Sequence, residues 1–155
     1  MPPLAAFAAF ALLGSAAAAQ EPDFRDAQFR VADIQARLLY EASGTLSADI
    51  SDDPEFHSWN TIIGEGSALE IANDLLVTAV VQGPGEHNLR TPLVVTVRDR
   101  RGRVLGRRRI TEMLTGTRTH RSILLHNVGC AGTITLSAQL GASTRTEEIA
   151  LNCGE

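Results

Sequence analysis

The chain has 155 residues, 44% of them hydrophobic, and a formal net charge of −4. This length suits one domain with a buried core. The acidic balance counts against nucleic acid as a partner, and so does the lack of aromatic residues interleaved with the basic ones, because single strands are bound on stacking aromatic side chains.

Residues 1–19 have the layout of a secretory signal peptide. An apolar run, Leu4–Leu13, is followed by Gly14 and Ser15 and then by the small residues 17–19 before Gln20. The alternative is an uncleaved membrane anchor, which the short run disfavours because a spanning helix needs about 20 apolar residues. We therefore expect cleavage after residue 19 and a periplasmic or extracellular protein without a transmembrane segment.

Residues 20–33 are polar and acidic and predict a flexible lead-in. A second interpretation stays open, because Phe24, Val31 and Leu38 lie at helical spacing and Asp23 could cap a helix over 23–38. The folded domain is expected over residues 34–155.

From there, short runs rich in Val, Ile, Leu and Thr alternate with turn residues, and no strand–helix–strand pattern is visible. We expect an all-β fold, a small antiparallel β-sandwich of the immunoglobulin-like kind with about seven to eight strands and one disulfide. The run 75–81 is apolar almost throughout, which predicts a central strand covered on both faces. The expected strands are 36–41, 56–63, 75–82, 93–99, 104–111, 117–126, 133–140 and 145–151.

The last two strands predict their own register. A two-residue turn at Gly141-Ala142 suits a type II′ hairpin, which needs a positive φ at its first position. Leu140 then pairs with Ser143, and partner numbers sum to 283. The same sum places Cys130 opposite Cys153 on one face. An exported chain with two cysteines favours a disulfide, so we predict the bond Cys130–Cys153.

Charge is distributed unevenly along the chain. Residues 90–121 contain ten Arg against two acidic residues, whereas residues 20–88 contain three Arg against thirteen. Most of these arginines lie in one expected hairpin. Because guanidinium groups bind phosphates and carboxylates, the arginines predict an anion- or partner-binding surface on that hairpin. The alternatives are a solvated strand edge and ion pairing within the molecule. The candidate residues are Arg98, Arg100, Arg101, Arg103, Arg107, Arg108 and Arg109.

A second candidate is the segment from Asp52 to Glu65, which holds the single Trp. Phe56, His57 and Trp59 could form a recognition loop, since exposed aromatic residues anchor interfaces. The alternative is a turn followed by a core Trp. The acidic spacing does not match a calcium loop, and no catalytic motif, glycine-rich phosphate loop or zinc spacing is present.

The sequence thus favours a non-catalytic, exported binding or assembly module of a bacterial cell envelope, without cofactor or metal. Its partner would be an envelope protein or an anionic polymer. Two alternatives stay open: an envelope polymer hydrolase that uses acidic residues near Asp52–Glu65, and a structural subunit that associates with itself.

Overall fold

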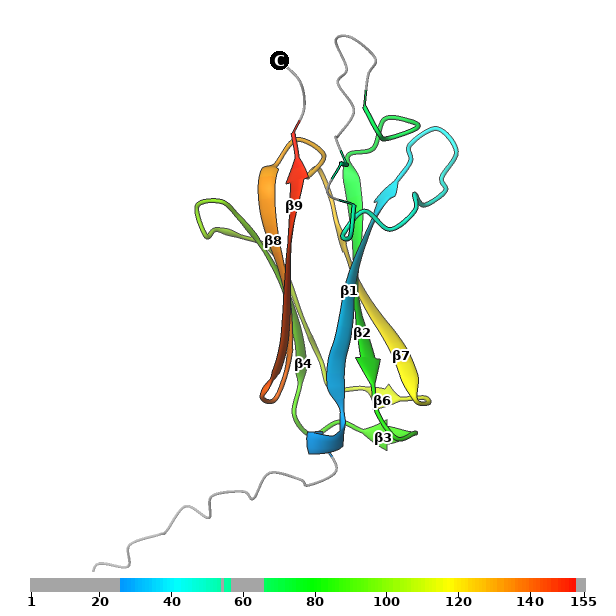
Figure 1. Cartoon of the computed structure of the whole chain (residues 1–155), viewed down its shortest axis with the longest axis vertical. Helices are drawn as coiled ribbons and strands as arrows, with labels where there is room; N and C mark the ends of the chain where they lie inside the picture. Colours follow the sequence, from blue (N-terminus) through cyan, green and yellow to red (C-terminus); the bar gives the residue numbers. More distant parts are fainter. Residues whose placement is uncertain (1–25, 54, 57–65, 153–155) are drawn as a thin grey trace, which may run out of the picture.

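The chain is all-β and antiparallel in a computed structural model that describes residues 26–53, 55–56 and 66–152 (Figure 1). Within these residues no helix is long and apolar enough to cross a membrane. A single 3-10 turn precedes the strands. The elements are η1 (Asp26–Gln28), β1 (Arg30–Leu39), β2 (Asp74–Gln82), β3 (His87–Asn88), β4 (Leu93–Asp99), β5 (Val104–Ile110), β6 (Met113–Leu114), β7 (Arg118–Leu125), β8 (Gly132–Leu140) and β9 (Ser143–Leu151).

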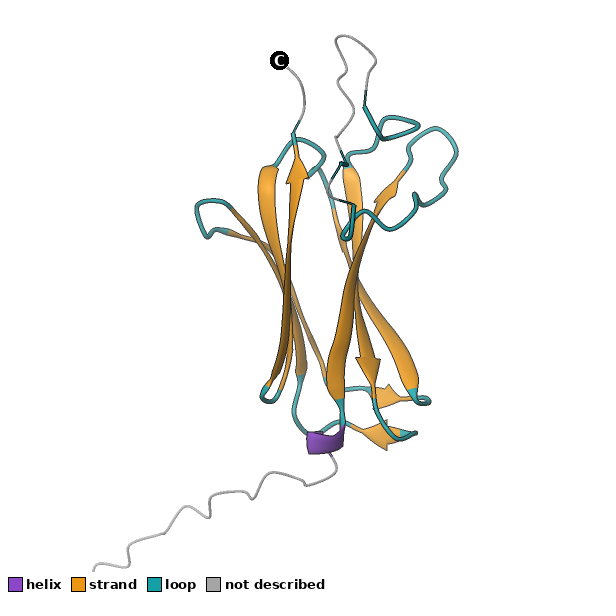
Figure 2. Ribbon diagram, viewed as in Figure 1, coloured by secondary structure: helices purple, strands orange, loops and turns teal. Residues whose placement is uncertain are grey.

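The strands form two larger sheets and one small one. The order is β1-β2-β7 in the first sheet and β5-β4-β8-β9 in the second, while β3 and β6 form a two-stranded sheet. Figure 2 shows the two larger sheets lying face to face, with the small sheet at the end near η1. Every paired strand is antiparallel.

One core lies between the two larger sheets. Ile34 and Val77 from the first sheet belong to the same buried cluster as Val95 and Leu136 from the second. β4 and β8 alternate as half-buried strands do, with every second side chain turned inward. The centre of the first sheet is β2, whose residues 77–81 are all buried. The expectation of a central strand there is confirmed.

The final hairpin has the register expected from its turn. Leu140 pairs with Ser143 and Gly132 with Leu151, so partner numbers sum to 283 along β8 and β9. Gly141 has φ +58° whereas Ala142 has no positive φ, which is the type II′ combination. Cys130 lies just before β8, and Cys153 lies outside the described residues, so the disulfide Cys130–Cys153 stays a prediction.

The beginning of the domain differs from the expectation. β1 starts at Arg30, within the segment expected to be a lead-in, and the helix considered over 23–38 is wrong for the residues of β1. The physical reason is pairing, because β1 lies along all of β2. A bulge between Val31 and Asp33 also interrupts the even alternation of side chains that would mark a strand in the sequence. The domain, expected over residues 34–155, thus begins earlier, because the boundary with the lead-in 20–33 falls within β1. The division between residues 1–19 and the rest stays a prediction, because residues 1–25 lie outside the described part.

Candidate functional site

The arginine-rich segment forms the hairpin of β4 and β5, and Asp99 organises its tip. The carboxylate of Asp99 accepts hydrogen bonds from the backbone N–H groups of Arg101 and Arg103 and from the side chain of Arg103 at 3.0 Å. Gly102 supplies the positive φ of +79° that the turn needs. Partial desolvation raises the pKa of Asp99, but these hydrogen bonds outweigh it and hold the pKa below its ordinary value.

The register of β5 on β4 decides which way its arginines face. Arg107 pairs with Thr96 and Arg109 with Val94, and these pairs lie on the outer face of the four-stranded sheet. Arg108 pairs with the buried Val95, on the opposite face. Since β5 is an edge strand, the Arg108 side chain extends past the core to the other sheet.

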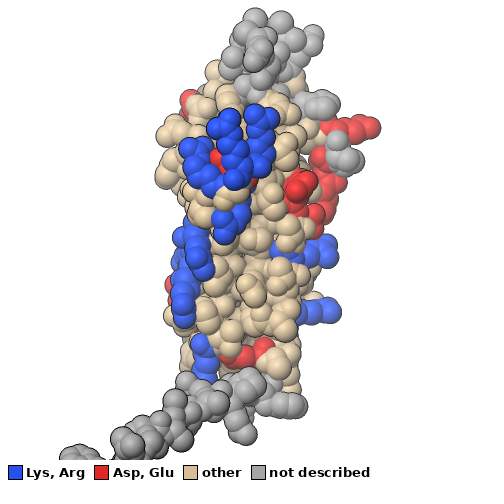
Figure 3. All heavy atoms as spheres, turned by 90° about the vertical axis from the view of Figure 1, so that its left-hand side faces the viewer, with Lys and Arg blue, Asp and Glu red and all other residues tan. Residues whose placement is uncertain are grey.

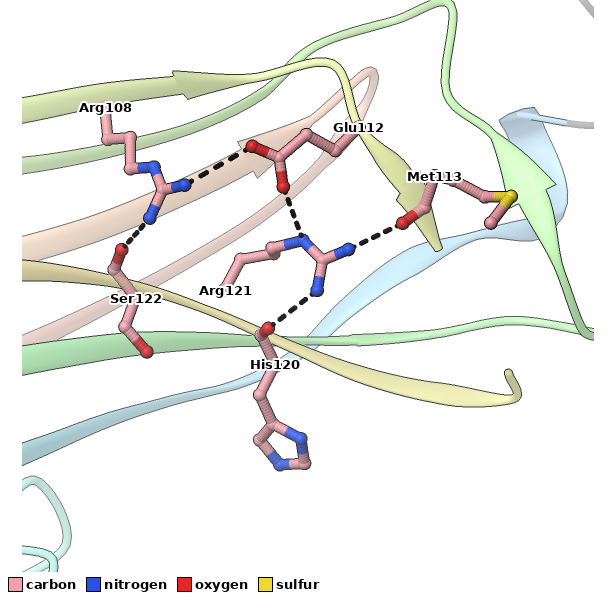
Figure 4. Close-up of polar contacts among 6 residues, drawn as sticks. All are labelled: Arg108, Glu112, Met113, His120, Arg121 and Ser122. Carbon is pink, nitrogen blue, oxygen red and sulfur yellow. Dashed lines mark hydrogen bonds and ion pairs between the residues drawn. The ribbon is translucent and has the colours of Figure 1, made fainter. Parts of the chain in front are cut away.

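Figure 4 shows where Arg108 ends. Its guanidinium donates to the backbone carbonyl of Ser122 on β7 at 2.6 Å and lies 3.4 Å from the carboxylate of Glu112. Arg121 lies 3.4 Å from the same carboxylate and donates to the carbonyls of Met113 and His120. The two guanidinium groups therefore donate hydrogen bonds to the backbone carbonyls of His120 and Ser122, along the outer edge of β7.

A glycine allows β5 to approach β7 so closely. A Cβ added at Gly106 would lie 2.2 Å from Cδ2 of Leu125 and 3.2 Å from Cδ1 of Ile123. Any side chain at position 106 would have to displace the Leu125 side chain, which is buried. The side chain of Leu125 thus packs against the strand next to Arg108 because position 106 has no side chain.

The seven candidate arginines divide into two groups. Arg98 donates to the carbonyl of Gly102, Arg103 to Asp99, and Arg108 to Ser122. The other four, named here the arginine face, are Arg100, Arg101, Arg107 and Arg109. All four are exposed, and in the described part of the chain no hydrogen bond or ion pair joins any of their side chains to another residue.

Figure 3 shows how the charge is arranged on this side of the molecule. Arg side chains gather near one end of this face and continue along one side, with a few acidic side chains among and beside them. Like charges held together in this way repel one another, and an anion that bridges them would relieve the repulsion.

The second candidate lies mostly outside the described residues, which include neither His57 nor Trp59. Phe56 is described, and it is buried in the core at 7% exposure, so it does not line an exposed loop. Asp53 caps a turn by accepting the N–H of Glu55 at 3.0 Å. No group of three or more possible metal ligands occurs among the described residues. The hydrolase alternative, which depends on this segment, stays a prediction.

One buried polar cluster, around Asp26, was not predicted from the sequence. Asp26, expected in a flexible lead-in, is 7% exposed and accepts hydrogen bonds from His87 Nε2 at 2.5 Å and from the N–H groups of Arg90 and Thr91. Phe29 stacks on the ring of His87, with centroids 5.0 Å apart. Burial raises the pKa of Asp26, but the hydrogen bonds outweigh it, so the pKa lies below its ordinary value of 3.8.

A pocket of about 330 Å³ opens beside this cluster, between η1 and the β8–β9 turn. Its lining is mainly apolar, with Phe29, Leu140 and Ala142 among the residues that form it. Both carboxylate oxygens of Asp26 already accept hydrogen bonds within the protein. The cluster therefore ties η1 to the β3–β4 connection, and its acid group is committed to that structural role.

Comparison with known proteins adds no family. No protein-family model matches the chain, and no curated protein is significantly similar to it in sequence.

Proposed function

We propose that this protein is a non-catalytic, exported binding module whose arginine face binds an anionic partner of the cell envelope. The observation that carries the proposal is the division of the arginines. Three of them have bonding partners within the protein, whereas Arg100, Arg101, Arg107 and Arg109 are exposed and have no side-chain partner among the described residues. Unpaired guanidinium groups on one rigid hairpin suit carboxylates or phosphates of a partner.

The proposal includes an immunoglobulin-like β-sandwich as the scaffold. Four strand pairings support it: β1 with β2, β2 with β7, β4 with β8, and β8 with β9. In an immunoglobulin domain these are the pairings A–B, B–E, C–F and F–G, while β5 pairs with β4 instead of extending the first sheet. Such scaffolds serve many unrelated functions, so the fold supports a binding role without specifying it.

The disulfide Cys130–Cys153 is part of the same proposal. It is supported by the register of β8 and β9, because the sum of 283 that relates their partners also relates the two cysteines. In an exported protein the bond would close the end of the hairpin opposite the turn and stabilise the fold by about 3 kcal/mol.

Binding to two anionic probes tests the role of the arginine face. The probes are soluble polyglutamate and vesicles that contain phosphatidylglycerol, and the variant is Arg100→Glu/Arg101→Glu/Arg107→Glu. The matched control, Arg30→Glu/Arg37→Glu/Arg118→Glu, makes the same charge change on the other sheet. We expect the first variant to bind a probe at least about tenfold more weakly than the control, since three lost contacts of ~0.5 kcal/mol each correspond to about that factor.

Ionic strength provides an independent readout. Binding through exposed charges weakens as the Debye length falls from about 30 Å at 0.01 M salt to about 3 Å at 1 M. Equal binding by both variants, or binding that salt does not change, would show that the arginine face is not the site.

A further inference from the structure

Three of the four outer edges of the larger sheets carry groups that block strand pairing. The edge of β1 is covered by the segment after it: Ser47 N–H donates to the carbonyl of Leu38, and Asp49 accepts the N–H of Ala36. The edge of β7 is occupied by Arg108 and Arg121. β5 carries three successive arginines, which would face like charges in a second β5.

The fourth edge is the outer side of β9, and its backbone groups are available. In an antiparallel pair only alternate residues bond to the neighbouring strand. Leu140 and Ser143 close the two-residue turn as a bonded pair, so the odd-numbered residues of β9 bond to β8. The N–H and C=O groups of Thr144, Thr146 and Glu148 therefore point away from the sheet. No hydrogen bond to these backbone groups is found within the described part of the chain.

β9 has neither proline nor a bulge, and its protection as an edge is the charge of side chains such as Arg145 and Glu147, which a partner strand would have to match. The strand is nine residues long and pairs with β8 without a register shift. β1 lies close to β9, and Val31 N–H donates to the side chain of Ser143 at 3.0 Å. β1 does not pair with β9, since the two strands belong to different sheets.

We propose that β9 pairs antiparallel with β9 of a second copy of this chain, around a two-fold axis at Thr146. The charges of the strand support this register. Arg145 would lie directly opposite Glu147 of the second copy, twice by symmetry, and Thr144 would lie opposite its Glu148. Within one chain Arg145 and Glu147 already share a face and form an ion pair at 3.3 Å, so both side chains point the way the pairing needs.

The neighbouring registers are excluded by the same charges. An axis one residue earlier would place Arg145 opposite Arg145, and an axis one residue later would place Glu147 opposite Glu147. Like charges directly opposite destabilise a strand pair. An axis at Thr146 is thus the register in this part of β9 that joins opposite charges on both sides.

The paired molecule would have one continuous sheet, because β9 is an edge of the four-stranded sheet. β5 is the opposite edge, so the two arginine faces would lie at the two far ends of that sheet. Two binding surfaces on one rigid body can engage one extended partner with an avidity above that of either surface alone. The proposal does not depend on the function of the arginine face, because it concerns the other edge.

Charge reversal and its rescue test the proposed register. Sedimentation of the purified protein should show a concentration-dependent dimer. Arg145→Glu should shift it to monomer, because the substituted carboxylate would face Glu147 of the second copy, and Arg145→Glu/Glu147→Arg should restore the dimer. A wild-type protein that stays monomeric at hundreds of micromolar, or a dimer that Arg145→Glu leaves unchanged, would overturn the proposal.

A cysteine at the axis tests the geometry directly. Two copies of Thr146 in a bonded pair would have Cα atoms about 5.5 Å apart, within the range of a disulfide. Thr146→Cys should therefore form a covalent dimer under mild oxidation. Glu148→Cys, on the same edge, should not, because its copies would be four residues out of register. Equal crosslinking of both variants would contradict an axis at Thr146.

Discussion

Removing the carboxylate of Asp26 should destabilise the domain strongly, although the residue lies at the start of the described chain. Its two oxygens accept hydrogen bonds from His87 at 2.5 Å, from the N–H of Thr91 at 2.6 Å and from the N–H of Arg90 at 3.1 Å. A hydrogen bond to a charged group contributes about 1.5–3 kcal/mol. Desolvation of the carboxylate offsets part of that sum.

We expect Asp26→Ala to lower the free energy of unfolding by about 3 kcal/mol, since breaking a buried charged network by removing one partner costs about 3–5 kcal/mol. Asp26→Asn keeps one acceptor and should cost about half as much. Urea unfolding, followed by circular dichroism, measures both. Glu86→Ala is the control, because Glu86 is exposed and immediately precedes His87.

The effect of Asp26 should depend on pH in a defined direction. Its pKa is lower in the folded protein than the ordinary value of 3.8, so the ionised form stabilises the fold. This stabilisation is fully present above about pH 4 and is lost as pH falls through the lowered pKa. The difference between wild type and Asp26→Asn should therefore shrink below pH 4. A cost under about 0.5 kcal/mol at pH 7, or one that does not change in acid, would refute the reasoning.

Two more predictions concern the approach of β5 to β7. Gly106→Ala should destabilise the protein by about 1–3 kcal/mol, because the added Cβ would lie 2.2 Å from the Leu125 side chain. The control Thr111→Ala, at an exposed position, should change the unfolding midpoint little. Arg108→Ala should cost about 1–2 kcal/mol by leaving the Ser122 carbonyl without its donor, whereas Arg107→Ala should cost under about 0.5 kcal/mol. Equal costs at positions 107 and 108 would contradict the opposite facing of these arginines.

The sequence indicated most strands because their cause is local. Runs of apolar and β-branched residues between turn residues correspond to β2, β4, β5, β7, β8 and β9, with ends within two residues of the expectation. The β8–β9 register followed from one glycine, since Gly141 alone decides the turn type and the turn decides the pairing. Strands β3 and β6 have two residues each and carry no periodic signal.

The start of β1 and the Asp26 cluster could not be predicted for a different reason. Both depend on partners distant in sequence: β1 pairs with β2, and Asp26 bonds to residues 61 to 65 positions later. An acidic residue before an apolar run is equally consistent with a flexible lead-in or a helix cap. The division of the arginines has the same origin: alternation along a strand separates Arg108 from Arg107 and Arg109, but only the register on β4 decides which of the two faces points to the core.

The most direct test of the arginine face is crosslinking of the protein in envelopes of its own organism. Wild type, Arg100→Glu/Arg101→Glu/Arg107→Glu and the control Arg30→Glu/Arg37→Glu/Arg118→Glu are compared. We expect one specific crosslinked partner, lost in the first variant and kept in the control. A partner that persists in the first variant, or none with the wild type, would contradict binding through this hairpin.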